Sequence, residues 1–122
     1  MVLGYARLSK DDLRKKYVSI ENQKDIIRKY AKANNLIVDE IYEDDGYSGY
    51  TLDRPGLNEI QHLVDEGLVD VILVKDLSRL GRHNAGVLLL LERLRKRGVR
   101  IIMIDDNYDS DVDDDDIVGI KT

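Results

Sequence analysis

An arginine and a serine stand two residues apart where the first apolar run of the chain ends. The run covers residues 2–8, Arg7 lies near its end and Ser9 follows it. On a strand, side chains two residues apart point to the same side, and open α/β sheets bind ligands beyond the carboxyl ends of their strands. A hydroxyl held beside a fixed positive charge is suited to attack a phosphate, so Ser9 is the candidate nucleophile.

Three more arginines come from later segments that are expected near the same place: Arg54, Arg79 and Arg82. Arg79 and Arg82 are three residues apart and share a face if their segment is helical. Guanidinium groups present planar, bidentate donors to phosphate oxygens. Fixed cations also stabilise the extra charge of a phosphoryl-transfer transition state. Together with Arg7, these residues predict a phosphodiester site with four arginines.

The elements that must position these residues follow from hydrophobic periodicity. Alternation of strands and helices is typical of an α/β fold with a mostly parallel sheet of four to five strands and helices on both faces. In that topology the segments after the first three strands meet at one rim. The pattern predicts strands at 2–8, 36–42, 69–74 and 99–104, helices at 19–34, 55–68 and 85–97, a polar turn or short helix at 76–83, loops at 10–17, 43–53 and 105–116, and the beginning of another helix at 117–122.

The predicted helices have recognisable ends. Ser19 is placed as an N-cap, and Pro55 suits the first turn of the second long helix. Gly67 and Gly98 lie at the ends of the second and third long helices and are expected to terminate them.

The composition fits one domain. A chain of 122 residues has the usual length of a single domain, and its 43% apolar content can fill one core. The absence of cysteine excludes disulfides, thiolate metal sites and cysteine nucleophiles, and it agrees with a cytoplasmic location. The longest apolar run, residues 85–91, is too short to span a bilayer, so we expect no membrane anchor.

Charge is segregated along the chain, although the net charge is −5. Basic residues outnumber acidic ones nine to four over residues 1–34 and eight to two over 75–100. Acidic residues outnumber basic ones ten to one over 35–74 and eight to none over 105–116. The net charge argues against a simple basic DNA-binding module, but local fields matter more here than the sum.

Four segments, in order over nearly the whole chain, resemble the catalytic domain of serine recombinases, the resolvase and invertase superfamily. The resemblance is to the branch of large integrases and transposases. The residues that carry it are Tyr5-Ala6-Arg7-Leu8-Ser9, Ser19-Ile20-Glu21-Asn22-Gln23, Asp44-Asp45-Gly46-Tyr47-Ser48-Gly49 with Asp53-Arg54-Pro55-Gly56, and Leu77-Ser78-Arg79-Leu80-Gly81-Arg82.

The resemblance implies roles for seven residues. Ser9 would attack the scissile phosphate, giving a 5′-phosphoserine link and a 3′-hydroxyl. Gln23 would be a polar support near the serine. Ser78, where many members have aspartate, would be a support only. The arginines that would bind and polarise the phosphate are Arg7, Arg79 and Arg82, with Arg54 completing the cluster.

The resemblance also implies partners. Members act on double-stranded DNA without a metal or a nucleotide cofactor, as dimers that join into a synaptic tetramer. A long helix and DNA-binding domains follow the catalytic domain in the family. We therefore expect residues 1–122 to be a catalytic domain truncated before or within that helix, and to be inactive in isolation.

Simpler interpretations exist for the individual residues. Arg54 would instead pair with Asp53 or Glu59 at the surface, and Gln23 would be an ordinary helix residue. His62 and His83 lack the spacing of metal ligands.

Three further residue patterns also have simpler explanations. Ser19 is explained by its cap, and Ser48 by a tight turn. The acidic run 113–116 lacks the glycine and terminal glutamate of an EF-hand loop.

The competing functions are a receiver-like or nucleotide-binding module and a non-catalytic regulatory or dimerisation fragment. A receiver needs paired acids after the first strand and an aspartate at the end of the third. The chain has Ser9-Lys10 and Val74-Lys75 at those places, and it lacks both G-x-G-x-x-G and a P-loop. If the catalytic interpretation is right, alanine at Arg79 or Arg82 should lower cleavage by roughly 3 kcal/mol of transition-state stabilisation and leave the fold intact, because each would remove a surface contact.

Overall fold

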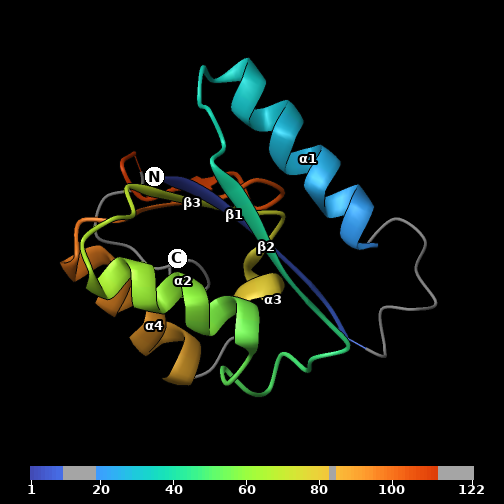
Figure 1. The fold of residues 1–122 in the computed structure, drawn as a ribbon, viewed down its shortest axis with the longest axis vertical. Coiled ribbons are helices and arrows are strands. Elements are labelled where there is room, and N and C mark those ends of the chain that lie inside the picture. Colours follow the sequence, from blue (N-terminus) through green and yellow to red (C-terminus); the bar gives the residue numbers. More distant parts are fainter. Residues whose placement is uncertain (10–18, 83–84, 113–122) are drawn as a thin grey trace.

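A five-stranded sheet forms the centre of the molecule (Figure 1). The computed structural model describes residues 1–9, 19–82 and 85–112. The strand order is β2-β1-β3-β4-β5, with β1 to β4 parallel and β5 antiparallel to β4. The strands are β1 (Val2–Leu8), β2 (Glu40–Asp45), β3 (Val71–Val74), β4 (Arg100–Met103) and β5 (Tyr108–Asp109). The α/β prediction is confirmed.

Helices cover both faces of the sheet, as predicted (Figure 1). Helix α1 (Ile20–Ala33) packs on one face, and α2 (Pro55–Asp65) and α4 (Ala85–Lys96) pack on the other. The short helix α3 (Leu77–Leu80) follows β3 directly, at the carboxyl ends of the parallel strands.

The sheet is buried from both sides. In β3, Ile72 and Val74 join the larger cluster under α2 and α4, while Val71 and Leu73 join the smaller cluster under α1. All four residues are buried, as expected for a parallel strand covered on both faces. The central strands therefore hold the rim in a rigid frame.

The helix ends match the prediction. The Ser19 hydroxyl accepts a hydrogen bond from the amide of Asn22, and Pro55 is the first residue of α2. Gly67 and Gly98 both have φ of +75°, a conformation that favours glycine after a helix.

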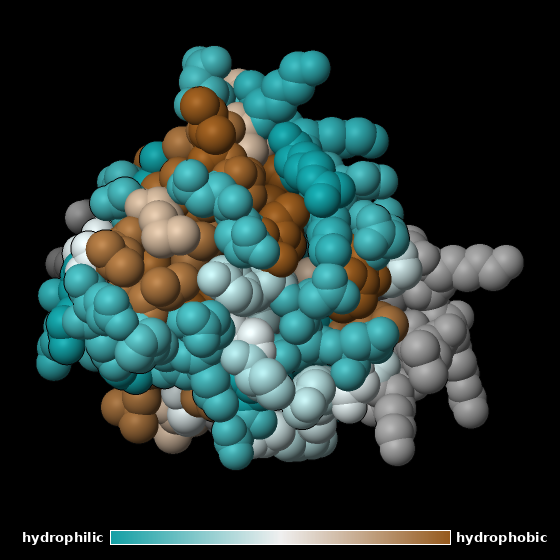
Figure 2. All heavy atoms as spheres, in the orientation of Figure 1, coloured by the Kyte–Doolittle hydropathy of each residue, from teal (hydrophilic) through white to brown (hydrophobic). Residues whose placement is uncertain are grey.

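The second strand lies further along the chain than predicted. The pattern placed it at 36–42, but β2 runs from Glu40 to Asp45, opposite Leu3 to Leu8 of β1. Leu36 and Val38 instead pack against the core cluster under α1 as the chain approaches the sheet. Figure 2 shows apolar atoms exposed beside α1, where these residues line a groove.

The predicted loop at 105–116 contains a two-residue strand, β5, that the hydrophobic pattern did not predict. Asn107, at φ +51°, turns the chain into β5, and Asp109 pairs with Arg100 at 2.6 Å. Asp106 accepts a hydrogen bond from the amide of Leu77, at the start of α3. These acids of the predicted loop therefore form a local ion pair and a helix cap. The predictions for 10–17, His83, 113–116 and 117–122 lie outside the described residues.

Candidate active site

The predicted convergence at one rim is confirmed. The loop after β2 begins beside the end of β1, where the amide of Gly46 donates to the carbonyl of Leu8 at 2.6 Å. One residue further, the Tyr47 carbonyl accepts a hydrogen bond from Arg7 Nη1 at 2.8 Å. The segment after β3 reaches the same place through Arg79, as described below.

Ser9 lies at the carboxyl end of β1, an inner strand of the sheet. The strand ends at Leu8, so Ser9 is the first residue beyond the ladder, and it is partly exposed. Its backbone neighbour Leu8 is held on one side by β2 and by the Gly46 amide. The hydroxyl is thus carried by the end of a fixed strand.

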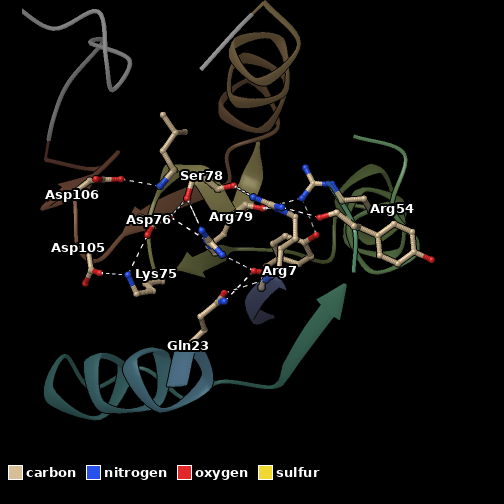
Figure 3. A network of polar contacts seen from close by, with 12 residues as sticks. Arg7, Gln23, Arg54, Lys75, Asp76, Ser78, Arg79, Asp105 and Asp106 are labelled. Atoms are coloured by element: carbon tan, nitrogen blue, oxygen red, sulfur yellow. Dashed lines mark hydrogen bonds and ion pairs between the residues drawn. The ribbon is translucent and has the colours of Figure 1, made fainter. Parts of the chain in front are cut away.

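Arg7 and Arg79 hold each other in place (Figure 3). Arg7 Nε donates to the carbonyl of Arg79 at 3.1 Å, and Arg79 Nη1 donates to the carbonyl of Arg7 at 2.7 Å. Arg7 Nη2 also donates to the carbonyl of Ser78. The two side chains are only 4% and 5% exposed. The two guanidinium groups are therefore buried beneath the rim, and their N–H groups donate to backbone carbonyls.

Gln23, which lies on α1, forms two hydrogen bonds with the main chain of Arg7 (Figure 3). Its side-chain oxygen accepts from the Arg7 amide at 3.1 Å, and its Nε2 donates to the Arg7 carbonyl at 3.0 Å. β3 pairs with β1 only as far as Tyr5 and Val74, so the Arg7 peptide lies beyond the last β3 partner. The Gln23 side chain supplies the hydrogen bonds that a neighbouring strand would make, so the buried amide and carbonyl groups of Arg7 both have partners.

Arg54 does not lie at the rim surface, contrary to the prediction. It is completely buried, and its Nη1 donates to the Tyr5 hydroxyl at 3.1 Å and to the carbonyl of Arg79 at 2.9 Å. Its Nη2 donates to the carbonyl of Leu80. The alternative of a surface pair with Asp53 or Glu59 was also wrong, because the guanidinium points into the core.

The carboxylate that balances Arg54 is Asp44, which the sequence analysis did not single out for a role. Asp44 is buried and accepts from the Tyr5 hydroxyl at 2.6 Å and from the amides of Gly56 and Leu57 at 2.7 and 3.0 Å. Tyr5 therefore bridges a buried carboxylate and a buried guanidinium. Burial and the hydrogen bond to Asp44 raise the pKa of Tyr5 above its ordinary value.

Ser78 supports the arginine cluster through Asp76 (Figure 3). Its hydroxyl donates to Asp76 at 2.6 Å and accepts from Arg79 Nη2 at 2.9 Å. Burial opposes the charged form of Asp76, but the bond from Ser78 and the charges of Arg79 and Lys75 outweigh it and lower its pKa. Lys75 is also paired with Asp105 at 2.7 Å. This network orients Arg79 from the side opposite Arg7.

Arg82 is the exposed one among the four predicted arginines. Helix α3 ends before it, so the expected helical face shared by Arg79 and Arg82 does not exist. The Arg82 amide instead donates to the carbonyl of Gly49 at 3.0 Å, and its guanidinium lies over the Tyr50 ring, 4.2 Å from the centroid.

The described part of the chain holds neither a membrane-spanning helix nor a metal-ligand cluster. No helix there is long and apolar enough to cross a membrane. Residues 1–9, 19–82 and 85–112 contain no cluster of three or more histidine, aspartate or glutamate side chains arranged to hold a metal ion. His62 is exposed and pairs with Glu66 at 2.6 Å.

Comparison with known proteins gives a consistent picture. The family described as "Resolvase, N terminal domain" matches residues 2–120. The chain is 37% identical over 112 residues to the transposon Tn3 resolvase of Escherichia coli, covering 92% of this chain and 54% of that protein. It is 31% identical over 108 residues to a putative DNA recombinase of Bacillus subtilis (strain 168), covering 88% of this chain and 21% of that protein. The chain thus spans about half, or less, of these relatives.

Solved structures share the fold. The N-terminal catalytic domain of TP901-1 integrase superposes with a TM-score of 0.82 at 29% identity, covering 92% of this chain and 82% of that one. A resolvase-family site-specific recombinase from Streptococcus pneumoniae gives a TM-score of 0.77 at 33% identity, covering 92% of this chain and 76% of that one.

Proposed function

The chain belongs to the family of the resolvase N-terminal domain, and we propose that it is the catalytic part of a serine site-specific DNA recombinase. In the proposed reaction the Ser9 oxygen attacks the scissile phosphorus of double-stranded DNA and loses its proton. The bond from phosphorus to the 3′-oxygen breaks, and that oxygen leaves as a 3′-hydroxyl. The 5′-phosphate stays on the serine, so the reverse attack can rejoin exchanged strands.

The observation that carries this proposal is the position of Ser9 two residues after Arg7, whose side chain is interlocked with that of Arg79. The serine follows the end of β1, and both arginines are fixed by hydrogen bonds to backbone groups of that rim. Charges that are already oriented cost no reorganisation when a phosphoryl transition state forms. The site is therefore suited to a reacting group that is anionic and gains charge.

The four arginines have three roles in this proposal. Arg82 is exposed and would contact the phosphate directly. Arg7 and Arg79 would supply positive field from beneath the rim, because their exposed fractions are small. Arg54, Gln23 and Ser78 would be positioning residues that act through the backbone or through Arg79.

The finer assignment is to the branch of large integrases and transposases, supported by the fold similarity to TP901-1 integrase. We further propose that the natural protein acts in the cytoplasm on double-stranded DNA as a dimer that joins into a synaptic tetramer. The additional length of the curated relatives agrees with DNA-binding segments outside residues 1–122.

The test uses the complete natural protein with DNA from the borders of its own element, quenched with denaturant. Peptide mass spectrometry then locates any covalently bound nucleotide. Ser9→Ala should abolish the adduct. Ser19→Ala is the matched control, because the Ser19 hydroxyl caps α1. It should cost about 1 kcal/mol of stability and leave the adduct in place.

Each other outcome has a definite meaning. An adduct on a different residue would keep the reaction class and discard Ser9 as the nucleophile. Bound DNA without any adduct would favour the regulatory or dimerisation fragment over an enzyme.

A further inference from the structure

The exposed arginine of the site is paired with an aromatic ring and not with an acid. The Arg82 guanidinium carbon lies 4.2 Å from the centroid of the Tyr50 ring, and Tyr50 is 73% exposed. In the part of the chain that the structure describes, no carboxylate forms an ion pair with Arg82. The neighbouring Arg79, in contrast, is paired with Asp76 at 3.2 Å.

The loop after β2 is built to bring Tyr50 to this place. The Ser48 hydroxyl accepts from the Tyr50 amide at 3.0 Å, which fixes the turn. Gly49 is buried, and its carbonyl accepts the Arg82 amide at 3.0 Å. A Cβ on Gly49 would lie 3.0 Å from Arg7 Nη2 and 3.4 Å from Arg82 Cγ. Glycine at this position therefore lets the loop lie against both arginines.

We propose that Tyr50 is a positioning residue, whose ring holds the Arg82 guanidinium ready for the scissile phosphate. A ring beneath the guanidinium attracts it through the π face and leaves its N–H donors available for phosphate oxygens. A carboxylate partner would fix the side chain equally well but would neutralise its charge and occupy its donors. The inference rests on the proposed function, since it takes Arg82 to be a phosphate contact.

A double-mutant cycle tests the coupling between Tyr50 and Arg82 in the complete natural protein. The rate of covalent complex formation is measured at saturating DNA for Tyr50→Leu, Tyr50→Phe, Arg82→Ala and the double variant Tyr50→Leu/Arg82→Ala. We expect Tyr50→Leu to lower the rate about two- to fivefold, the range of an exposed cation–π contact. Tyr50→Phe should keep the wild-type rate. In the Arg82→Ala background, Tyr50→Leu should change nothing further.

A second measurement does not depend on activity. The Arg82 Nε–H resonance of the 122-residue chain should be shifted upfield by the ring in the wild type and in Tyr50→Phe, and should lose that shift in Tyr50→Leu. Because Tyr50 is mostly exposed, the leucine variant should unfold at the same urea concentration as the wild type.

Each remaining outcome refutes either the positioning role of Tyr50 or the phosphate contact of Arg82. Equal losses from Tyr50→Leu with and without Arg82 would mean that the ring contacts DNA itself, which refutes the positioning role. A wild-type rate in Tyr50→Leu, with a loss in Arg82→Ala, would refute the inference alone. A wild-type rate in Arg82→Ala would remove Arg82 from the proposed reaction.

Discussion

The buried bridge from Asp44 through Tyr5 to Arg54 should be worth several kcal/mol, and Tyr5→Phe tests it. The substitution removes one hydroxyl and leaves the ring in the core. Two hydrogen bonds to charged groups are lost, one to Asp44 at 2.6 Å and one from Arg54 at 3.1 Å. Such bonds contribute about 1.5–3 kcal/mol each.

The expected loss is smaller than the sum of the two. Asp44 keeps the amides of Gly56 and Leu57, and Arg54 Nη1 keeps the carbonyl of Arg79. Both groups remain partly satisfied, so we expect the free energy of unfolding to fall by about 2–4 kcal/mol. Urea denaturation of the 122-residue chain measures this difference directly.

Tyr42→Phe is the matched control. Tyr42 is the β2 residue in register with Tyr5, and its hydroxyl makes no hydrogen bond to any residue of the described segments. Its loss should stay within about 0.5 kcal/mol. If Tyr5→Phe lost no more than Tyr42→Phe, the bridge would contribute nothing net, and the reasoning that makes Arg54 a scaffold residue would fail.

Three further predictions concern pH, packing and the arginines. Burial and the bond to Asp44 raise the pKa of Tyr5 above 10.0, so above pH 10 the unfolded chain releases a proton that the native chain keeps. This contribution to the free energy of unfolding is complete below pH 10 and is lost as pH rises, by up to about 1.4 kcal/mol per pH unit. Urea titrations should therefore show that the free energy of unfolding falls less steeply with pH in Tyr5→Phe than in the wild type. Gly56→Ala should lower the free energy of unfolding by about 2 kcal/mol in urea denaturation, because the new Cβ would meet the carbonyl of Glu43 at 2.9 Å. Gly46→Ala is the control: its Cβ would lie in open space, and its φ of +85° should cost about 1 kcal/mol. Equal losses in the two variants would contradict the clash. Arg79→Ala should reduce cleavage and also lower the free energy of unfolding in urea, by about 2–4 kcal/mol. Arg82→Ala should reduce cleavage, but its free energy of unfolding should stay within about 0.5 kcal/mol of the wild type. An unchanged stability of Arg79→Ala would contradict its buried role.

Much of the frame was predictable because it depends on local signals. The all-apolar run of β3, the cap at Ser19 and the glycines at 67 and 98 each act within a few residues. Parallel topology then brings the ends of β1, β2 and β3 to one rim without further information. This is why the positions of Arg7 and Arg79 near Ser9 could be expected.

The burial of Arg54 was not predictable from such signals. It is the only lysine or arginine between residues 35 and 74, among ten aspartates and glutamates, which is typical of an exposed residue. Its burial depends on Tyr5, 49 positions away, and on Asp44, whose inward orientation follows only if β2 extends to residue 45. The premise that Arg79 makes only a surface contact was wrong for the same reason, since Arg79 is 5% exposed and bonds to the Arg7 carbonyl.

The buried arginines also explain why so short a helix can position Arg82. The last carbonyls of any helix lack partners within it, and α3 has only four residues. Arg7 binds the carbonyls of Ser78 and Arg79, and Arg54 binds those of Arg79 and Leu80. The two guanidiniums thus cap α3 and bring their charge to the negative end of its dipole.

Arg82 follows that capped end by two residues, so its backbone position depends on side chains that do not themselves reach the surface. The arginines of this rim are consequently coupled. The buried ones set where the helix stops, and where the helix stops sets where the exposed one can meet a phosphate.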